Sequence, residues 1–91
     1  MTHEELKNIA AEYLQEVVIF PDLEPALVGY MWDILQDGSE IMRAVYDYYK
    51  ILDCLVKQGR SDEEAVDWFS YNTLRTAQYV KGGPKFLYTN P

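Results

Sequence analysis

The chain has 91 residues, of which 15 are acidic and 8 are basic, with one cysteine and one histidine. This length predicts a single domain over residues 1–91, with room for one functional site. The net charge of −7 disfavours contact with nucleic acid or with anionic membranes, and it favours a basic partner. Because Cys54 is the only cysteine, no internal disulfide can form, which indicates a reducing, cytoplasmic location.

Several kinds of site are excluded by what the sequence lacks. The longest apolar stretch, Val17–Phe20, is far shorter than the roughly 20 residues that cross a bilayer. Zinc and haem sites need several histidine or cysteine ligands, which His3 and Cys54 do not supply. No acidic run has the ligand spacing of a calcium loop. The sequence therefore predicts no membrane contact, no metal and no cofactor.

The first segment predicts an amphipathic helix over about residues 3–18. Thr2 and Glu5 have the spacing of a capping box, and His3 is expected to face solvent at the helix start. One face repeats apolar residues at three- and four-residue steps: Leu6, Ile9, Ala10, Tyr13, Leu14 and Val17. The outer face is acidic: Glu4, Glu5, Glu12 and Glu16.

A β-hairpin is predicted after the first helix. Pro21 and Pro25 impose a turn, residues 26–30 have strand composition, and Asp37 with Gly38 indicates a hairpin turn. Apolar and polar residues then alternate over about residues 41–47, which predicts the second strand. Residues 31–36 fit a helical turn equally well, so a mostly helical fold is the alternative.

Two helices and a strand complete the predicted order. The spacing of Ile51, Leu52, Leu55 and Val56 predicts a helix over residues 49–57, which Gly59 ends. A second capping box, from Ser61 to Glu64, begins a helix that runs to about residue 79. Residues 85–89 have strand composition. We therefore expect an α+β fold in which the hairpin and the last strand form a small antiparallel sheet.

No catalytic centre is indicated by the reactive residues. Cys54 lies between leucines of a predicted helix and is interpreted as a small buried hydrophobic residue. Ser61 is accounted for by helix capping, and Gly82 and Gly83 precede a proline instead of opening a phosphate-binding helix. The sequence predicts a non-enzymatic protein. A hydrolase that uses a pair of carboxylates is a further alternative, because 15 acids form many pairs.

Aromatic and acidic residues predict a binding surface. The chain has eight tyrosines and two tryptophans, the residue types most enriched at interface centres. Nine of the acids and one base lie in residues 1–42, so a basic partner is expected to meet this half; the alternative is that these acids only confer solubility. The predicted partner-binding residues are Glu12, Glu16, Asp33, Asp37, Glu40, Tyr48, Tyr71, Asn72 and Arg75.

Three sequence stretches resemble a group of small, mostly uncharacterised bacteriophage and prophage proteins. These stretches are LVGY at residues 27–30, AVYDYYK at residues 44–50 and EEAVDWFSYNTLR at residues 63–75, followed by a proline-led strand at residues 84–88. The resemblance implies a hairpin, two helices and a final strand. It implies no established chemistry, but a phage setting in the cytoplasm of an infected or lysogenic bacterium.

The resemblance also implies a role, since small acidic phage proteins often bind host machinery and include inhibitors of CRISPR nucleases. Together with the charge pattern, it predicts a non-enzymatic inhibitor or modulator of a host protein with a basic surface, such as a nucleic-acid-binding defence nuclease. The chain itself is expected not to bind nucleic acid. The alternative function is a homo-oligomeric structural or accessory phage protein whose exposed aromatic residues form the interface.

Overall fold

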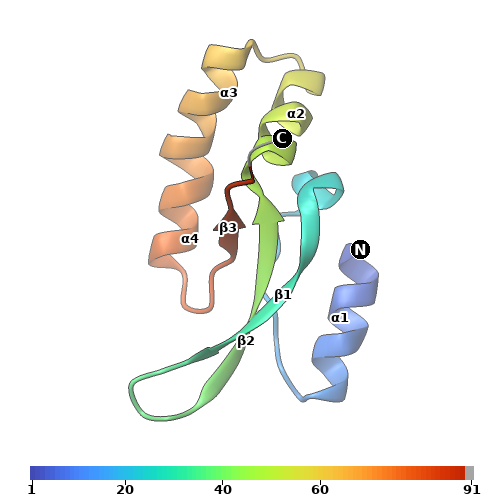
Figure 1. Cartoon of the computed structure of the whole chain (residues 1–91), viewed down its shortest axis with the longest axis vertical. Coiled ribbons are helices and arrows are strands. Elements are labelled where there is room, and N and C mark those ends of the chain that lie inside the picture. Colours follow the sequence, from blue (N-terminus) through green and yellow to red (C-terminus); the bar gives the residue numbers. More distant parts are fainter. Residues whose placement is uncertain (90–91) are drawn as a thin grey trace.

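The computed structural model describes residues 1–89 and has an α+β fold, as predicted (Figure 1). In the view of Figure 1, the sheet lies between α1 on one side and the α3–α4 helical segment on the other. The elements in chain order are α1 (His3–Glu12), η1 (Pro21–Ala26), β1 (Leu27–Ile34), β2 (Glu40–Asp47), α2 (Tyr48–Lys57), α3 (Asp62–Trp68), η2 (Phe69–Leu74), α4 (Arg75–Tyr79) and β3 (Lys85–Leu87).

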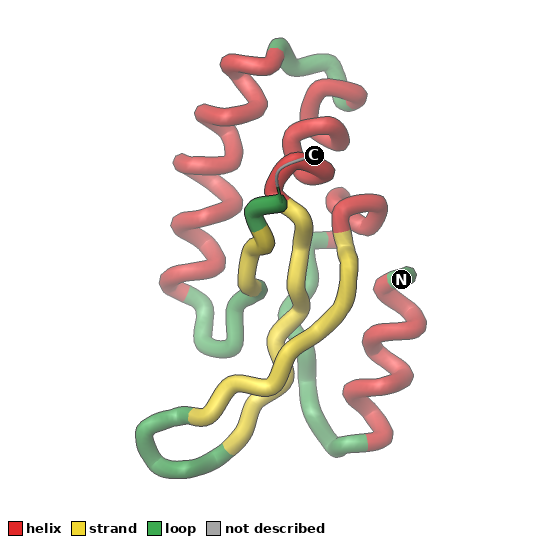
Figure 2. Tube along the Cα trace, in the orientation of Figure 1, coloured by secondary structure: helices red, strands yellow, loops and turns green. Residues whose placement is uncertain are grey.

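Strands β1 and β2 form the predicted hairpin. They pair antiparallel from Leu27 opposite Tyr46 to Ile34 opposite Glu40, with a register shift between Leu27 and Gly29. The turn lies at the predicted place, where Gly38 has a φ of 86°, a left-handed conformation that glycine adopts without steric cost. The ambiguous residues after Tyr30 continue β1 to Ile34, and the hairpin tip extends away from the helices (Figure 2).

The expectation of a purely antiparallel sheet was wrong. The sheet has the order β1-β2-β3, and β3 pairs parallel to β2, with Val45 opposite Lys85 and Asp47 opposite Leu87. Between β2 and β3 the chain passes through α2 and the α3–α4 segment. Such a helical crossover returns the chain in its original direction, so the two strands it joins run parallel.

The hydrophobic core lies where α1, η1 and α2 meet the sheet. Its largest fully buried side chains are Tyr46, Leu6, Met42, Ile51 and Leu55. Cys54 is buried in the same core, as predicted, and burial raises the pKa of its thiol. Burial in apolar surroundings is typical of a structural cysteine.

The α3–α4 segment is one continuous helical run, as expected, with a wider π-type turn at η2. Phe69, Thr73 and Ala77 are buried on its inner face. These residues are four apart, and the wider turn keeps them on one side of a helix that would otherwise rotate them away. Val66, three residues before Phe69, is exposed. Trp68 is 43% exposed and lies under the guanidinium of Arg60, 4.0 Å from its ring centre.

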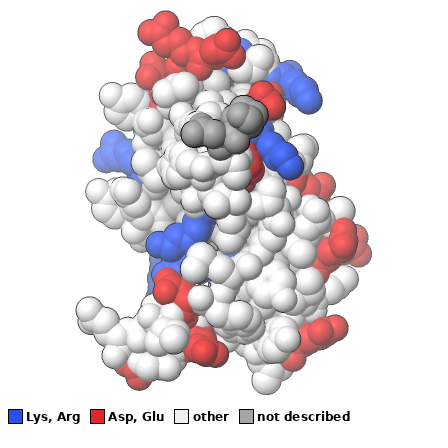
Figure 3. All heavy atoms as spheres, viewed as in Figure 1, with Lys and Arg blue, Asp and Glu red and all other residues white. Residues whose placement is uncertain are grey.

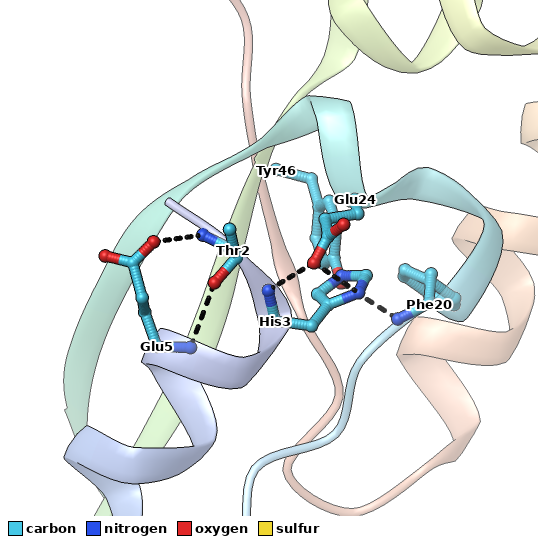
Figure 4. Close-up of polar contacts among 6 residues, drawn as sticks. All are labelled: Thr2, His3, Glu5, Phe20, Glu24 and Tyr46. Carbon is cyan, nitrogen blue, oxygen red and sulfur yellow. Dashed lines mark hydrogen bonds and ion pairs between the residues drawn. The ribbon is translucent and has the colours of Figure 1, made fainter.

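His3 does not face solvent, as the sequence suggested, but is buried against Tyr46 (Figure 4). Its Nε2 lies 2.8 Å from the Tyr46 hydroxyl, and its backbone N–H donates to Glu24 at 2.7 Å. The Tyr46 hydroxyl also accepts a hydrogen bond from the Phe20 N–H at 2.9 Å, and burial raises the pKa of Tyr46 to about 12. These contacts tie the start of α1 to η1 and to the centre of the sheet.

Acidification is expected to weaken the fold through His3. Burial lowers the pKa of its imidazole, an effect that the Glu24 carboxylate partly offsets. The unfolded chain therefore binds a proton first, and the free energy of unfolding should fall as the pH drops below about 6.5, the ordinary histidine value. Urea unfolding between pH 7.5 and pH 5.5 measures this slope. His3→Gln should remove most of it, whereas an equal slope in both proteins would contradict the assignment.

Candidate protein-binding surface

The most unusual backbone conformation outside glycine lies at the end of α1. Leu14 has a φ of 56° and is 95% exposed. Its N–H donates to the carbonyl of Ala11, and the N–H of Gln15 donates to the carbonyl of Ala10, which is the hydrogen-bond pattern of a Schellman helix end. A left-handed conformation costs a leucine about 1–2 kcal/mol, and glycine usually occupies this position. The fold thus holds an apolar side chain in solvent at an energetic cost.

Two contacts join the end of α1 to the hairpin. The rings of Tyr13 and Trp32 meet edge to face with their centres 5.2 Å apart. The side-chain amide of Gln15 donates to the carbonyl of Glu40 at 3.4 Å. Glu12 and Glu16 flank Tyr13 and Leu14 in the sequence, and the Gln15 contact places this end of α1 beside Glu40. We call this region the acidic aromatic surface and define it as Glu12, Tyr13, Leu14, Glu16, Trp32 and Glu40.

The charge of this surface is negative. Figure 3 shows acidic side chains along the α1 side of the molecule, around the hairpin and at the top of the view, with lysine and arginine where the hairpin meets the body and at separate places on the upper part. Glu12, Glu16 and Glu40 are exposed. Two bases are close to Glu16, because Lys7 and Lys81 each line a shallow hollow together with it. The surface thus combines exposed apolar side chains with neighbouring side chains that are mostly acidic. This combination complements a partner with both apolar and basic groups.

Two of the predicted acids are placed differently. Asp33 follows Trp32 in β1 and points to the opposite face of the sheet, because successive side chains of a strand alternate. There its carboxylate accepts a hydrogen bond from Arg43 Nε at 2.7 Å. Asp37 lies in the hairpin turn, where it accepts hydrogen bonds from the Ser39 hydroxyl and N–H, and these bonds lower its pKa. The expected single patch of acids is therefore divided.

The other predicted residues lie away from the acidic aromatic surface. Tyr48 is half-buried, with its ring centre 4.9 Å from those of Phe69 and Tyr88. Tyr71, Asn72 and Arg75 are exposed on the α3–α4 run, on the opposite side of the sheet from α1 in Figure 1. Of the nine predicted residues, three lie at the junction of the α1 end with β2: Glu12, Glu16 and Glu40. The other six do not form one continuous site with them.

A second hollow, of about 580 Å³, lies between the hairpin and the turn after α4. Arg43, Lys81 and Lys85 line it together with apolar side chains such as Ile41 and Phe86. Arg43 is already engaged, since it bonds Asp33 and donates to the carbonyl of Gly83 at 2.9 Å. In residues 1–89 no three histidine, cysteine or acidic side chains are grouped to hold a metal ion, and no helix is long and apolar enough to cross a membrane.

The sequence did not predict that Tyr13, Leu14 and Trp32 are exposed. Tyr13 and Leu14 fitted the apolar stripe of a longer helix, and they became exposed because α1 ends at Glu12. Trp32 lies in residues 31–36, for which the sequence pattern fits a strand and a helical turn equally well. Comparison with protein-family models, with curated proteins and with solved structures gives no match for this chain.

Proposed function

We propose that this chain is a non-enzymatic protein-binding module that uses the acidic aromatic surface to bind a protein with a basic surface. One observation carries the proposal: Leu14 is held fully in solvent in a left-handed conformation, beside the Tyr13–Trp32 pair. Backbone strain of this kind is concentrated at functional sites, where the partner contact offsets it. An exposed apolar side chain next to exposed aromatic rings supplies the anchor that protein interfaces use.

The resemblance to small phage proteins supports a narrower form of the proposal. The partner would be a host protein that binds nucleic acid, such as a CRISPR or other defence nuclease, and the chain would inhibit or modulate it. Acids placed around an apolar anchor favour this partner class, because the channel that holds a nucleic-acid backbone is basic. The direct test first captures the partner from bacterial lysate with the purified chain. It then measures nucleic-acid binding and cleavage by this partner, with and without the chain. Unchanged binding and cleavage would contradict the inhibitor role.

Reversing two acids should slow association with the partner. The variant carries Glu12→Lys with Glu16→Lys; both residues are exposed and neither has an ion-pair partner within residues 1–89, so stability should change little. Loss of electrostatic steering is expected to reduce the association rate about tenfold at low salt. The measurement uses biolayer interferometry with the main bacterial protein that the wild-type chain captures, at two salt concentrations.

The matched control changes the net charge equally at a different place. Asp53→Lys with Asp67→Lys replaces two exposed acids on α2 and α3. At about 0.1 M salt this control should associate within about twofold of the wild type, because charges beyond the Debye length of about 10 Å are largely screened at that ionic strength. Equal slowing by both double variants would show that only net charge matters. If the variant with Glu12→Lys and Glu16→Lys associates at the wild-type rate, these acids do not contribute to partner binding.

A further inference from the structure

The outer edge of β1 has no strand partner. In the sheet order β1-β2-β3, the edge strands are β1 and β3. Strand β1 has eight residues, whereas β3 has three. Over the part of the chain that the structure describes, the backbone of residues 30–34 is hydrogen-bonded only along β2. A free row of N–H and C=O groups of this length is a template for a further strand.

The usual features that block an edge are missing from residues 30–34. This stretch has no lysine and no proline, and its one charge, Asp33, is neutralised by Arg43 at 2.7 Å. The irregularity between Leu27 and Gly29 disturbs only the beginning of the strand. Met31 is 39% exposed and Ile34 is 69% exposed, so apolar side chains are available beside the free backbone groups. The regular, open part of the edge is therefore Tyr30–Ile34.

The charges before and after β1 indicate what binds its edge. Exposed acids precede β1 at Asp22 and Glu24 and follow it at Asp37 and Glu40. Residues 8–42 contain no lysine or arginine. A second copy of the chain, paired antiparallel, would bring the acids after one β1 beside the acids before the other, and like charges in neighbouring strands are destabilising. A segment with an apolar centre and basic ends is complementary at both ends.

We propose that the partner protein adds an extended segment with an apolar centre and basic ends to the β1 edge at residues 30–34, which makes the sheet four-stranded. Backbone hydrogen bonds would supply affinity, and alternate side chains would supply specificity. Trp32 lies on the same face as Tyr13, so the added strand also borders the acidic aromatic surface. This inference rests on the proposed function, because it describes how that same basic partner is held.

The test uses a synthetic peptide with a centre of alternating valine and threonine and two lysines at each end. Backbone amide exchange is followed by NMR in the full isotope-labelled chain. At a peptide concentration about ten times its Kd, the amides of residues 30–34 that point away from β2 should exchange about tenfold more slowly. A peptide with proline at alternate positions, which lacks the donors for a β ladder, should give no such protection.

A pair of matched variants locates the contact. Met31→Lys places a cation on the edge and should weaken peptide binding about tenfold, since lysine is a typical edge-blocking residue. Val66→Lys on α3 introduces the same change at a residue that is 40% exposed, close to the 39% of Met31, and should leave binding unchanged. Circular dichroism of both variants checks that the fold is intact.

Each outcome separates the inference from the proposed function. No slowing at residues 30–34, or equal slowing with the proline peptide, would overturn strand addition. If the Glu12 and Glu16 reversal still slows partner association, the proposed function stands without strand addition. If residues 30–34 are not protected and the reversal does not slow association, the inference and the proposed function are both wrong. Protection of residues 30–34 without peptide, together with a dimer in light scattering, would assign the edge to a second copy and would also overturn the inference.

Discussion

Replacing Tyr46 with alanine is expected to lower the free energy of unfolding by about 3–5 kcal/mol. Tyr46 is fully buried at the centre of β2, and its ring packs against Phe20 with ring centres 5.4 Å apart. Small domains have a total stability of about 5–15 kcal/mol, so Tyr46→Ala removes a large share and leaves a substantial unfolded fraction at 37 °C. Urea unfolding followed by circular dichroism measures the change.

A second variant separates the Tyr46 hydroxyl from its ring. Tyr46→Phe keeps the ring but leaves the Phe20 N–H and the His3 Nε2 without their hydrogen-bond partner, which is expected to cost about 1–3 kcal/mol. Tyr79→Phe removes the hydroxyl of a tyrosine that is 78% exposed and should change stability by less than about 0.5 kcal/mol. A Tyr46→Phe protein as stable as the wild type would show that the ring alone joins α1 to the sheet.

Gly83→Ala is expected to destabilise the protein by about 3 kcal/mol, at the upper end of typical overpacking. A methyl group on Gly83 would overlap the carbonyl oxygen of Ala77 and lie 3.0 Å from its carbonyl carbon. Both atoms belong to the backbone of α4, so no side-chain rotation relieves the clash. The turn must shift, which moves β3 and its Phe86 away from Phe69, whose ring centre is 5.0 Å away.

Gly29 offers the matched control for this substitution. A methyl group there would meet no atom within 4 Å. Gly29→Ala should therefore change the free energy of unfolding by less than about 0.5 kcal/mol. Urea unfolding of both variants, with an NMR spectrum to follow the Phe86 resonances, tests the difference. Equal stabilities for the two variants would contradict the close packing of residue 83 against α4.

The elements that begin at local signals could be predicted from the sequence. Both capping boxes form as expected, at Thr2 with Glu5 and at Ser61 with Glu64. The hairpin turn forms at Asp37 and Gly38. These features depend on hydrogen bonds between residues two to four apart, so the local sequence is enough to predict them.

Features that depend on distant residues were not predictable. The direction of β3 is set by the crossover through α2 and the α3–α4 segment, and the burial of His3 is set by Tyr46, 43 residues later. The end of α1 was also missed, since a leucine in a left-handed conformation has no sequence signature. This third error concealed the candidate site, because Tyr13 and Leu14 are typical core residues by pattern. The acids of the site were found because surface charge is a reliable guide to exposure.

Site-specific crosslinking from position 14 tests the central claim most directly. The photoreactive residue p-benzoyl-phenylalanine replaces Leu14 in one protein and Tyr79, on α4, in another, and each is irradiated in bacterial lysate. The proposed function predicts a crosslink from position 14 to a basic protein, weaker at high salt because exposed charges are screened, and no such product from position 79. No crosslink from position 14, or the same product from both positions, would contradict the account.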